Sequence, residues 1–438
     1  MVGEKQPLQL LDNLLFPKIF LTFRMAIQPA KLAIAFSTLM IICLAGWLMD
    51  FSRTVVATKG SQGNETELQI YMADPAGVQP YIESFRDRGE RTGVFAALWR
   101  FTAARFKGTV DSLFAFNLPA VAGNIIDCFK AVRWALKYHF LYCLIFFVIK
   151  LAAISIGGGA VCRIAALQFA RGERPGLIEA LRFSIRKFTS FFATPLVPVG
   201  LVILIGVCIF LLGVVGNIPR AGELIMAVFM FLALFAGVLI AIVFIGAVAG
   251  FNLMFPAVAY DGSDCLDAFS RSFSYIYARP WRMGFYTAIA AVYGAVCYTF
   301  VRLFAFLLLW VTHRFLQLGV RVDSSSKAVN KLMTIWQEPK FIKLVDPSGL
   351  AAGNWSESLA AFLVQLLLLA VVGLIISFIM SFYFSANTII YSLMRNRVDG
   401  TALDDVYTHF DEAKIRSAPA ESGSDEVLPE SESQADRS

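Results

Sequence analysis

Residues 225–251 read IMAVFMFLALFAGVLIAIVFIGAVAGF, an apolar run without a single charged side chain. A helix needs about 20 such residues to cross the hydrocarbon core of a bilayer. Because 58% of the whole chain is hydrophobic and only 16% is charged, one soluble core could not bury so much apolar surface. The run therefore predicts a transmembrane helix, and the composition predicts several more.

Five further runs meet the same criterion, so that the predicted spans are 32–50, 141–160, 194–215, 225–251, 283–311 and 360–384. They predict an all-α fold, a polytopic membrane helix bundle of about six spans. Residues 1–30 form the N-terminal segment and residues 31–410 the transmembrane domain. From residue 411 the chain is acidic and almost free of large apolar side chains, which predicts a disordered tail over 411–438.

Basic residues in the short connections orient the spans, because Lys and Arg are enriched on the cytoplasmic side. The connection after the second span carries Arg163, Arg171, Arg174, Arg182, Arg186 and Lys187 against only Glu173 and Glu179. This predicts an inner-membrane protein with both termini in the cytoplasm and with external loops at 52–137 and 313–357. The partners expected are membrane lipids, and proteins that bind the acidic tail or the external loops; no nucleic-acid partner is expected.

The first external loop contains two amphipathic stretches. Residues 94–107 (VFAALWRFTAARFK) place aromatic side chains at helical spacing beside Arg100 and Lys107. Lys130, Arg133 and Lys137 form a second basic stripe just before the second span. Both stretches predict interfacial helices, with apolar side chains toward the lipid and cations at the headgroups.

Three spans leave the membrane through similar glycine turns, which predicts an internal repeat. The segments are ARGERPGLIEALRFSIRKF from Ala170, AYDGSDCLDAFSRSFSYIY from Ala259 and RVDGTALDDVYTHF from Arg397. The second and third share an Asp-Gly pair followed by another Asp, and the first and second share an acid, then Ala, then Ser. The turn residues are Gly172, Asp261, Gly262, Asp267, Asp399, Gly400 and Asp405.

Such turns have two explanations. Any helix that ends at a membrane surface tends to have this pattern, and duplication of one segment within the chain would also produce it. Duplication is the favoured interpretation. Glycine supplies the positive φ of a C-cap, and an acid favours the N-terminus of the next helix. The next helix is then expected to rest on the interface, where cations reach lipid phosphates. The candidate lipid contacts are Arg182, Arg186, Lys187, Arg271 and Arg279.

The order of apolar span, glycine turn, acid-Ala-x-x-x-Ser helix and aromatic re-entry resembles uncharacterised bacterial multi-pass membrane proteins. Among them is the membrane domain associated with glycerophosphodiester phosphodiesterases. The ending Ile390-Tyr391-Ser-Leu-Met-Arg395-Asn-Arg397-Val-Asp399-Gly400 is similar to their final span exit, and the resemblance covers about residues 140–410. It implies the architecture, and it carries over no catalytic residue because the chain has no recognisable phosphodiesterase domain.

Lys150 and Arg302 lie inside predicted spans, where a charge is costly and commonly functional. They are candidate contacts for an anionic ligand; alternatively, the second span is shifted outward and Arg302 reaches the interface. The histidines and cysteines are scattered, so neither a metal nor another cofactor is expected, and no catalytic motif is present.

The leading hypothesis is a non-enzymatic scaffold or accessory for lipids or proteins. A transporter or lipid-handling protein is the alternative, and an intramembrane enzyme comes third. A filled core would favour the scaffold, and a continuous polar cavity at Lys150 or Arg302 would favour the transporter.

Overall fold

The computed structural model describes residues 16–52, 54–60, 63–85, 90–219, 221–319, 332, 335–341, 344 and 354–407. The predicted acidic tail over 411–438 lies outside these residues, as do residues 1–15 and most of the predicted loop 313–357. Within the described chain, 6 helical segments are long and apolar enough to cross a membrane: Pro29–Ser52, Phe140–Arg171, Phe188–Val215, Ala221–Asp261, Pro280–Gly319 and Trp355–Val398. The predicted all-α polytopic membrane bundle is confirmed.

The elements follow one another along the chain with few strands among many helices. Their order is η1 (Phe16–Leu21), α2 (Thr22–Ala26), α3 (Pro29–Met49), η2 (Asp50–Ser52), β1 (Val55–Gly60), β2 (Gly63–Thr66), α4 (Glu67–Ala73), α5 (Val78–Phe85), β3 (Glu90–Thr92), α6 (Val94–Phe114), α7 (Leu118–Tyr138), α8 (Phe140–Arg171), α9 (Leu177–Arg186), α10 (Phe188–Ala193), η3 (Thr194–Leu196), α11 (Val197–Val215), α12 (Ala221–Asp261), α13 (Cys265–Ala278), α14 (Pro280–Gly319) and α16 (Trp355–Val398).

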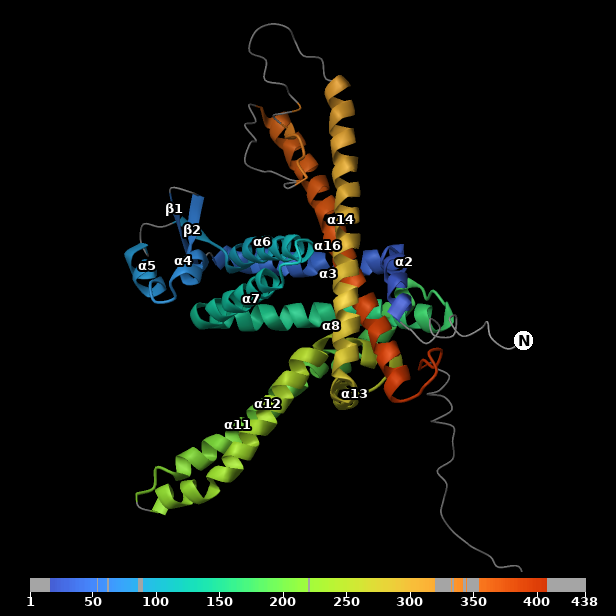
Figure 1. The fold of residues 1–438 in the computed structure, drawn as a ribbon. Coiled ribbons are helices and arrows are strands. Elements are labelled where there is room, and N and C mark those ends of the chain that lie inside the picture. Colours follow the sequence, from blue (N-terminus) through green and yellow to red (C-terminus); the bar gives the residue numbers. More distant parts are fainter. Residues whose placement is uncertain are drawn as a thin grey trace, which may run out of the picture.

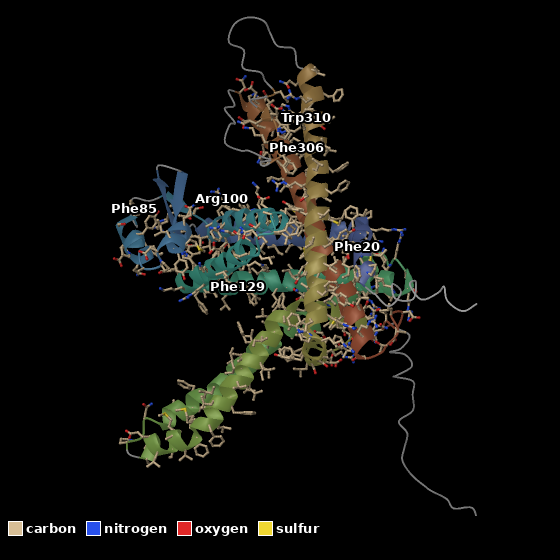
Figure 2. All side chains as sticks on the ribbon, viewed as in Figure 1. Phe20, Phe85, Arg100, Phe129, Phe306 and Trp310 are labelled. Atoms are coloured by element: carbon tan, nitrogen blue, oxygen red, sulfur yellow. The ribbon has the colours of Figure 1, made fainter. Side chains whose placement is uncertain are left out.

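The spans associate in three pairs that diverge from a common hub (Figure 1). We call α3 with α8 arm 1, α11 with α12 arm 2, and α14 with α16 arm 3. Most large apolar side chains of arm 2 are exposed on the surface of the protein, and Figure 2 shows them projecting from both of its helices. A helix that is apolar on all sides is suited to hydrocarbon, because its backbone polar groups are already paired within the helix.

The hub is a cluster of buried side chains from the C-terminal halves of α8, α12 and α16 and the N-terminal half of α14, together with η1, α2, α3, α9, α10 and α13. Consecutive glycines in α8 permit this convergence, because a Cβ on any of them would collide with a different neighbour. The facing pairs are Gly157 with Thr38 of α3, Gly158 with Phe384 of α16, and Gly159 with Ser184 of α9 and Phe191 of α10. One turn of α8 therefore contacts its partner helix α3 in arm 1, α16 of arm 3 and the two helices that follow α8.

The helices are longer than the spans predicted from hydropathy. α12, α14 and α16 contain 41, 40 and 44 residues, which corresponds to about 60 Å at about 1.5 Å per residue. The hydrocarbon core is about 30 Å thick, so these helices are tilted or extend beyond it. Hydropathy marks only the apolar part of each helix, whereas packing in the hub continues the helix through polar residues.

The predicted first external loop, 52–137, contains folded structure at the end of arm 1 that lies far from the hub (Figure 1). Its three-stranded antiparallel sheet has the order β2-β1-β3. Val55, Leu68 and Trp134 form part of a small core beneath this sheet. The helix predicted over 94–107 is present within α6, and the stripe of Lys130, Arg133 and Lys137 lies on α7.

Candidate functional site

The predicted turn glycines lie at the hub ends of the three arms. Gly172, Gly262 and Gly400 follow α8, α12 and α16 with φ of 73°, 63° and 69°. This left-handed conformation is the one that a helix C-cap requires and that glycine adopts without steric strain. The positive φ predicted from the sequence is therefore confirmed at all three turns.

The acid-Ala-Ser pattern marks the face on which α9 and α13 pack back onto the preceding span. Ala180 and Ser184 of α9 are buried, and so are Ala268 and Ser272 of α13. The Ser184 hydroxyl donates to backbone carbonyls of α8 at 2.9 Å and 2.7 Å, and its oxygen lies opposite Gly159. The sequence predicted helices that rest on the interface, but the structure places one face of each in the hub.

Asp261, the last residue of α12, connects arm 2 to arm 3. Its carboxylate lies 3.2 Å from the guanidinium of Arg395 on α16 and 3.2 Å from that of Arg271 on α13. The Tyr391 hydroxyl of α16 donates to the same carboxylate. Because the Asp261 side chain is almost completely buried, it needs these partners to offset its lost hydration. Asp261 was expected only to favour the N-terminus of the next helix, but its carboxylate also joins α12 to α16.

The other acids of the turns also contact α13 or the end of α16. Asp267 pairs with Arg271 at 3.1 Å, and Asp405 pairs with Arg395 at 3.0 Å. Asp399 accepts a hydrogen bond of 2.5 Å from the Tyr275 hydroxyl of α13. Burial and this hydrogen bond raise the pKa of the Tyr275 phenol. These contacts join the second turn and α13, which follows it, to the third turn and the end of α16.

The segment 399–407, which we call the C-terminal strap, crosses the ends of α8 and α12. Arg163 donates to the backbone carbonyls of Ala259 and Tyr407 at 3.0 Å and 2.8 Å. The Tyr407 amide donates to the Tyr260 carbonyl at 3.1 Å. Lys187 donates to the Gly262 carbonyl at 2.8 Å. The Tyr407 amide of the strap thereby satisfies a carbonyl group that the end of α12 leaves without a helical partner, and Arg163 and Lys187 satisfy two others.

Arg163 and Lys31 correct two of the sequence assignments. Arg163 counted as a loop cation, but α8 continues through it and the residue is buried. Lys31 directly precedes the predicted span 32–50, where a cation is expected to face water, but it is fully buried in the hub. Its ammonium group donates to Gln168 Oε1 at 3.0 Å and to Ser385 Oγ at 3.4 Å. Hydropathy could not locate either residue, because each lies just beyond the end of an apolar run, where the predicted span ends.

The candidate lipid contacts on α9 and α13 divide into two groups. Lys187 and Arg271 are engaged within the hub by the contacts described above. Arg182, Arg186 and Arg279 are exposed at the hub surface. All five stay candidate headgroup contacts, and two of them, Lys187 and Arg271, also bind groups of the hub.

Two cavities open beside the hub, between the arms. The first, about 320 Å³, is bounded by α6, α12, α14 and α16. The second, about 270 Å³, is bounded by α8, α12 and α16. Both are lined mainly by apolar side chains, and both include Asn252 and Tyr383. The Tyr383 hydroxyl donates to Asn252 Oδ1 at 2.6 Å, so one polar pair separates two apolar chambers.

Lys150 of α8 lines the second cavity beside Phe251 and Phe384. It is exposed on the surface of the protein chain, although it lies inside a membrane span. A lysine in this position needs an anionic partner or a path to the headgroups. Its ammonium group is therefore the cationic group at an otherwise apolar opening.

Arg302 has a different environment. Its guanidinium donates to the Phe341 carbonyl at 3.0 Å and to the Tyr298 hydroxyl at 2.8 Å. Arg302 does not line either of the two cavities. The structure does not bring Lys150 and Arg302 together, and Arg302 instead attaches the segment around Phe341 to α14.

The described chain thus defines a class: a multi-pass α-helical membrane protein with a closed hub and apolar cavities between its arms. Comparison of the chain with family models, curated proteins and solved structures gave no match. The fold and the cavities themselves are consequently the basis for a functional proposal.

Proposed function

We propose that the protein is a non-enzymatic membrane protein that binds an anionic amphiphile of the bilayer between its arms. The observation that carries this proposal is Lys150 at the opening of an apolar cavity that shares Asn252 and Tyr383 with a second one. The cavities lie near the lower end of the size range of small-molecule sites, and such sites combine apolar walls with a few polar groups.

The lining indicates which part of an amphiphile would contact the apolar walls and which part would contact the polar groups. Apolar chain atoms gain about 0.8 kcal/mol per buried methylene when they leave water, but a lipid chain leaves hydrocarbon, so the walls alone supply little affinity. Selection then depends on the polar end. The Lys150 ammonium is a compact charge suited to a phosphate or carboxylate, and the Asn252 amide offers further hydrogen bonds.

A transporter for polar solutes receives less support, because the two cavities are largely apolar rather than a continuous polar path. A scaffold for partner proteins is a second proposal, and the filled hub supports it, since it holds three arms apart.

We also propose that the hub faces the cytoplasm of a bacterial inner membrane. Arg171, Arg174 and Arg182 gather at this side beside the span ends, as the positive-inside rule requires.

The turns support the further proposal that each arm, with the helix after it, is one copy of a repeat. Each arm consists of two spans followed by a left-handed glycine, and two of the glycines precede a helix with a buried Ala-Ser face. Repeats in membrane proteins place binding sites where the copies meet. The two cavities lie where arm 2 meets arms 1 and 3.

Native mass spectrometry of the full chain, released from its own membranes in nanodiscs, tests lipid binding. The protein should retain an anionic lipid, and Lys150→Gln should weaken retention about tenfold, which corresponds to one charge-assisted hydrogen bond of about 1.5 kcal/mol. Lys150→Arg should preserve binding. Lys340→Gln removes an exposed lysine that lines neither cavity and is the matched control. Lipid retention that is the same in the wild type, Lys150→Gln and Lys340→Gln would contradict the proposal.

A further inference from the structure

We propose that α6 and α7 form a re-entrant hairpin that enters the bilayer beside arm 1, turns within it and returns to the same side. The sequence placed both helices on the membrane surface. In the structure, α3, α6, α7 and α8 run side by side, with the sheet at one end of the group and the hub at the other (Figure 1). Neither α6 nor α7 is among the 6 candidate spans.

The two ends of α6 lie at different depths along the arms. Asp50 follows the outer end of α3, and its carboxylate accepts the Phe95 and Ala96 amides at 2.9 Å each, which caps the start of α6. Farther along, the Phe106 ring lies 5.4 Å from the Tyr298 ring of α14. Leu113, in the last turn, lines the first cavity. The 21 residues of α6 extend for about 30 Å, a distance similar to the thickness of the hydrocarbon core.

The tip between the two helices is apolar and exposed. Phe116 is 89% exposed, and Phe114 and Leu118 on either side of it are exposed as well. Phe116 also adopts a φ of 53°, which is uncommon for a bulky residue. Three large apolar side chains at a loop tip would be unfavourable in water, but they are favourable in hydrocarbon.

The outer face of α7 carries an apolar stripe that continues the lipid-facing surface of arm 1. Ile125, Phe129, Val132 and Leu136 recur at helical spacing and are all exposed (Figure 2 labels Phe129). The exposed side chains continue into α8 with Leu141. Since α8 spans the membrane, the lipid that surrounds it is the partner that covers this stripe.

The charges of the hairpin are arranged so that it can enter the bilayer. Asp127 of α7 pairs with Arg105 of α6 at 3.4 Å and with Lys130 at 3.1 Å, and paired charges are the form in which ionised groups occur at membrane depth. Lys107 and Asp111 have opposite charge and stand one turn apart. The remaining cations lie toward the outer ends, where they reach headgroups: Arg100, Arg133 and Lys137.

Cysteine labelling of the purified full chain in liposomes tests this placement. Phe116→Cys reports the tip, and Ser84→Cys on α5 reports the region beside the sheet. A water-soluble, membrane-impermeant maleimide is applied to sealed and to opened vesicles, and the labelled residue is located by peptide mass spectrometry. Native Cys208, which is exposed on α11 within a span, is the internal reference. Leu118→Cys repeats the measurement if Phe116→Cys folds poorly.

We expect Ser84→Cys to be labelled at least tenfold more than Phe116→Cys, which should react as little as Cys208 in both vesicle preparations. A nitroxide at residue 116 should collide with oxygen and not with a water-soluble nickel chelate. Labelling of Phe116→Cys equal to that of Ser84→Cys would place the hairpin in water. Labelling from the side opposite to Ser84→Cys would mean that the hairpin crosses the membrane. Either outcome overturns the proposal.

Discussion

At the scale of single residues, the three turn glycines share a backbone conformation but differ in their surroundings. Gly172 and Gly400 have open space where a Cβ would stand. At Gly262 a Cβ would collide with the ring of Tyr407, which belongs to the C-terminal strap. The same glycine turn in the sequence is therefore open at two positions and tightly packed at the third.

Alanine at these positions separates backbone strain from packing. Gly172→Ala and Gly400→Ala should each lower the free energy of unfolding by about 1–2 kcal/mol, the cost of a left-handed non-glycine residue. Gly262→Ala should lower it further, and Tyr407→Ala in the same chain should recover part of the difference. Thermal unfolding in detergent compares the three single variants and the double variant. Equal losses at the three glycines would show that the strap does not press on Gly262.

The buried ion pair of Asp261 and Arg395 provides a second prediction. Asp261→Asn removes the buried carboxylate that Arg395 and Arg271 share and leaves them only the more exposed Asp405 and Asp267, so we expect a loss of about 3–5 kcal/mol in the free energy of unfolding. Asp267→Asn breaks a more exposed pair with Arg271 and should lose less than about 1 kcal/mol. Denaturant titration followed by circular dichroism compares the two. If Asp267→Asn lost as much as Asp261→Asn, burial would not be the deciding factor.

At the scale of elements, glycine determines which helices can approach one another. The glycines of α8 face three different neighbours, and Gly246 and Gly250 of α12 face Phe273 and Ile276 of α13. The small-xxx-small pattern of α12 thus packs against a helix of the same chain, as close helix contacts in membranes require. By contrast, Gly206 of α11 has nothing near its Cβ position.

Alanine substitution at two helical glycines tests this distinction. Gly159→Ala would push against Ser184 and Phe191 and should lower the melting temperature in detergent, with a loss of about 1–3 kcal/mol. Gly206→Ala should be neutral or raise stability by about 0.5–1 kcal/mol, because alanine is the better helix former. A loss at Gly206→Ala as large as that at Gly159→Ala would contradict the packing argument.

At the scale of the whole molecule, the hub unites elements from both halves of the chain. α8, α9 and α10 from the first half pack against α12, α13 and α16 from the second. The outer ends of the arms diverge from one another away from the hub, as Figure 1 shows. The hub should therefore hold the molecule together even when the connection within an arm is cut.

A protease site inserted between Asn217 and Ile218, at the tip of arm 2, tests this expectation. After cleavage in detergent the two fragments should elute together in size-exclusion chromatography and separate only in denaturant. Arg163→Met, which removes the contacts to Ala259 and Tyr407, should make the cleaved complex dissociate at lower denaturant concentration. Separation of the fragments under native conditions would show that arm 2, and not the hub, carries the association.

The sequence by itself determined the membrane class, the six spans and the conformation of the turn glycines. These features depend on local properties, namely runs of apolar residues and the φ that a helix end demands. The sequence also indicated Lys150 as a charge inside a span. Its prediction that a helix follows each turn was correct for the first two turns, but the described residues after the third, 401–407, are not helical, and the burial of the helices in the hub was not foreseen.

Only the tertiary structure decided how the spans are arranged and which residues meet. Arg163 and Tyr407 are 244 positions apart in the sequence, and Lys31 and Ser385 are 354 apart. No periodicity within a window of residues encodes such pairs, because they depend on the directions in which whole helices leave the hub. The same holds for Lys150 and its cavity, since the walls come from α8, α12 and α16. Local chemistry determined what each segment is, and long-range packing determined what it can bind.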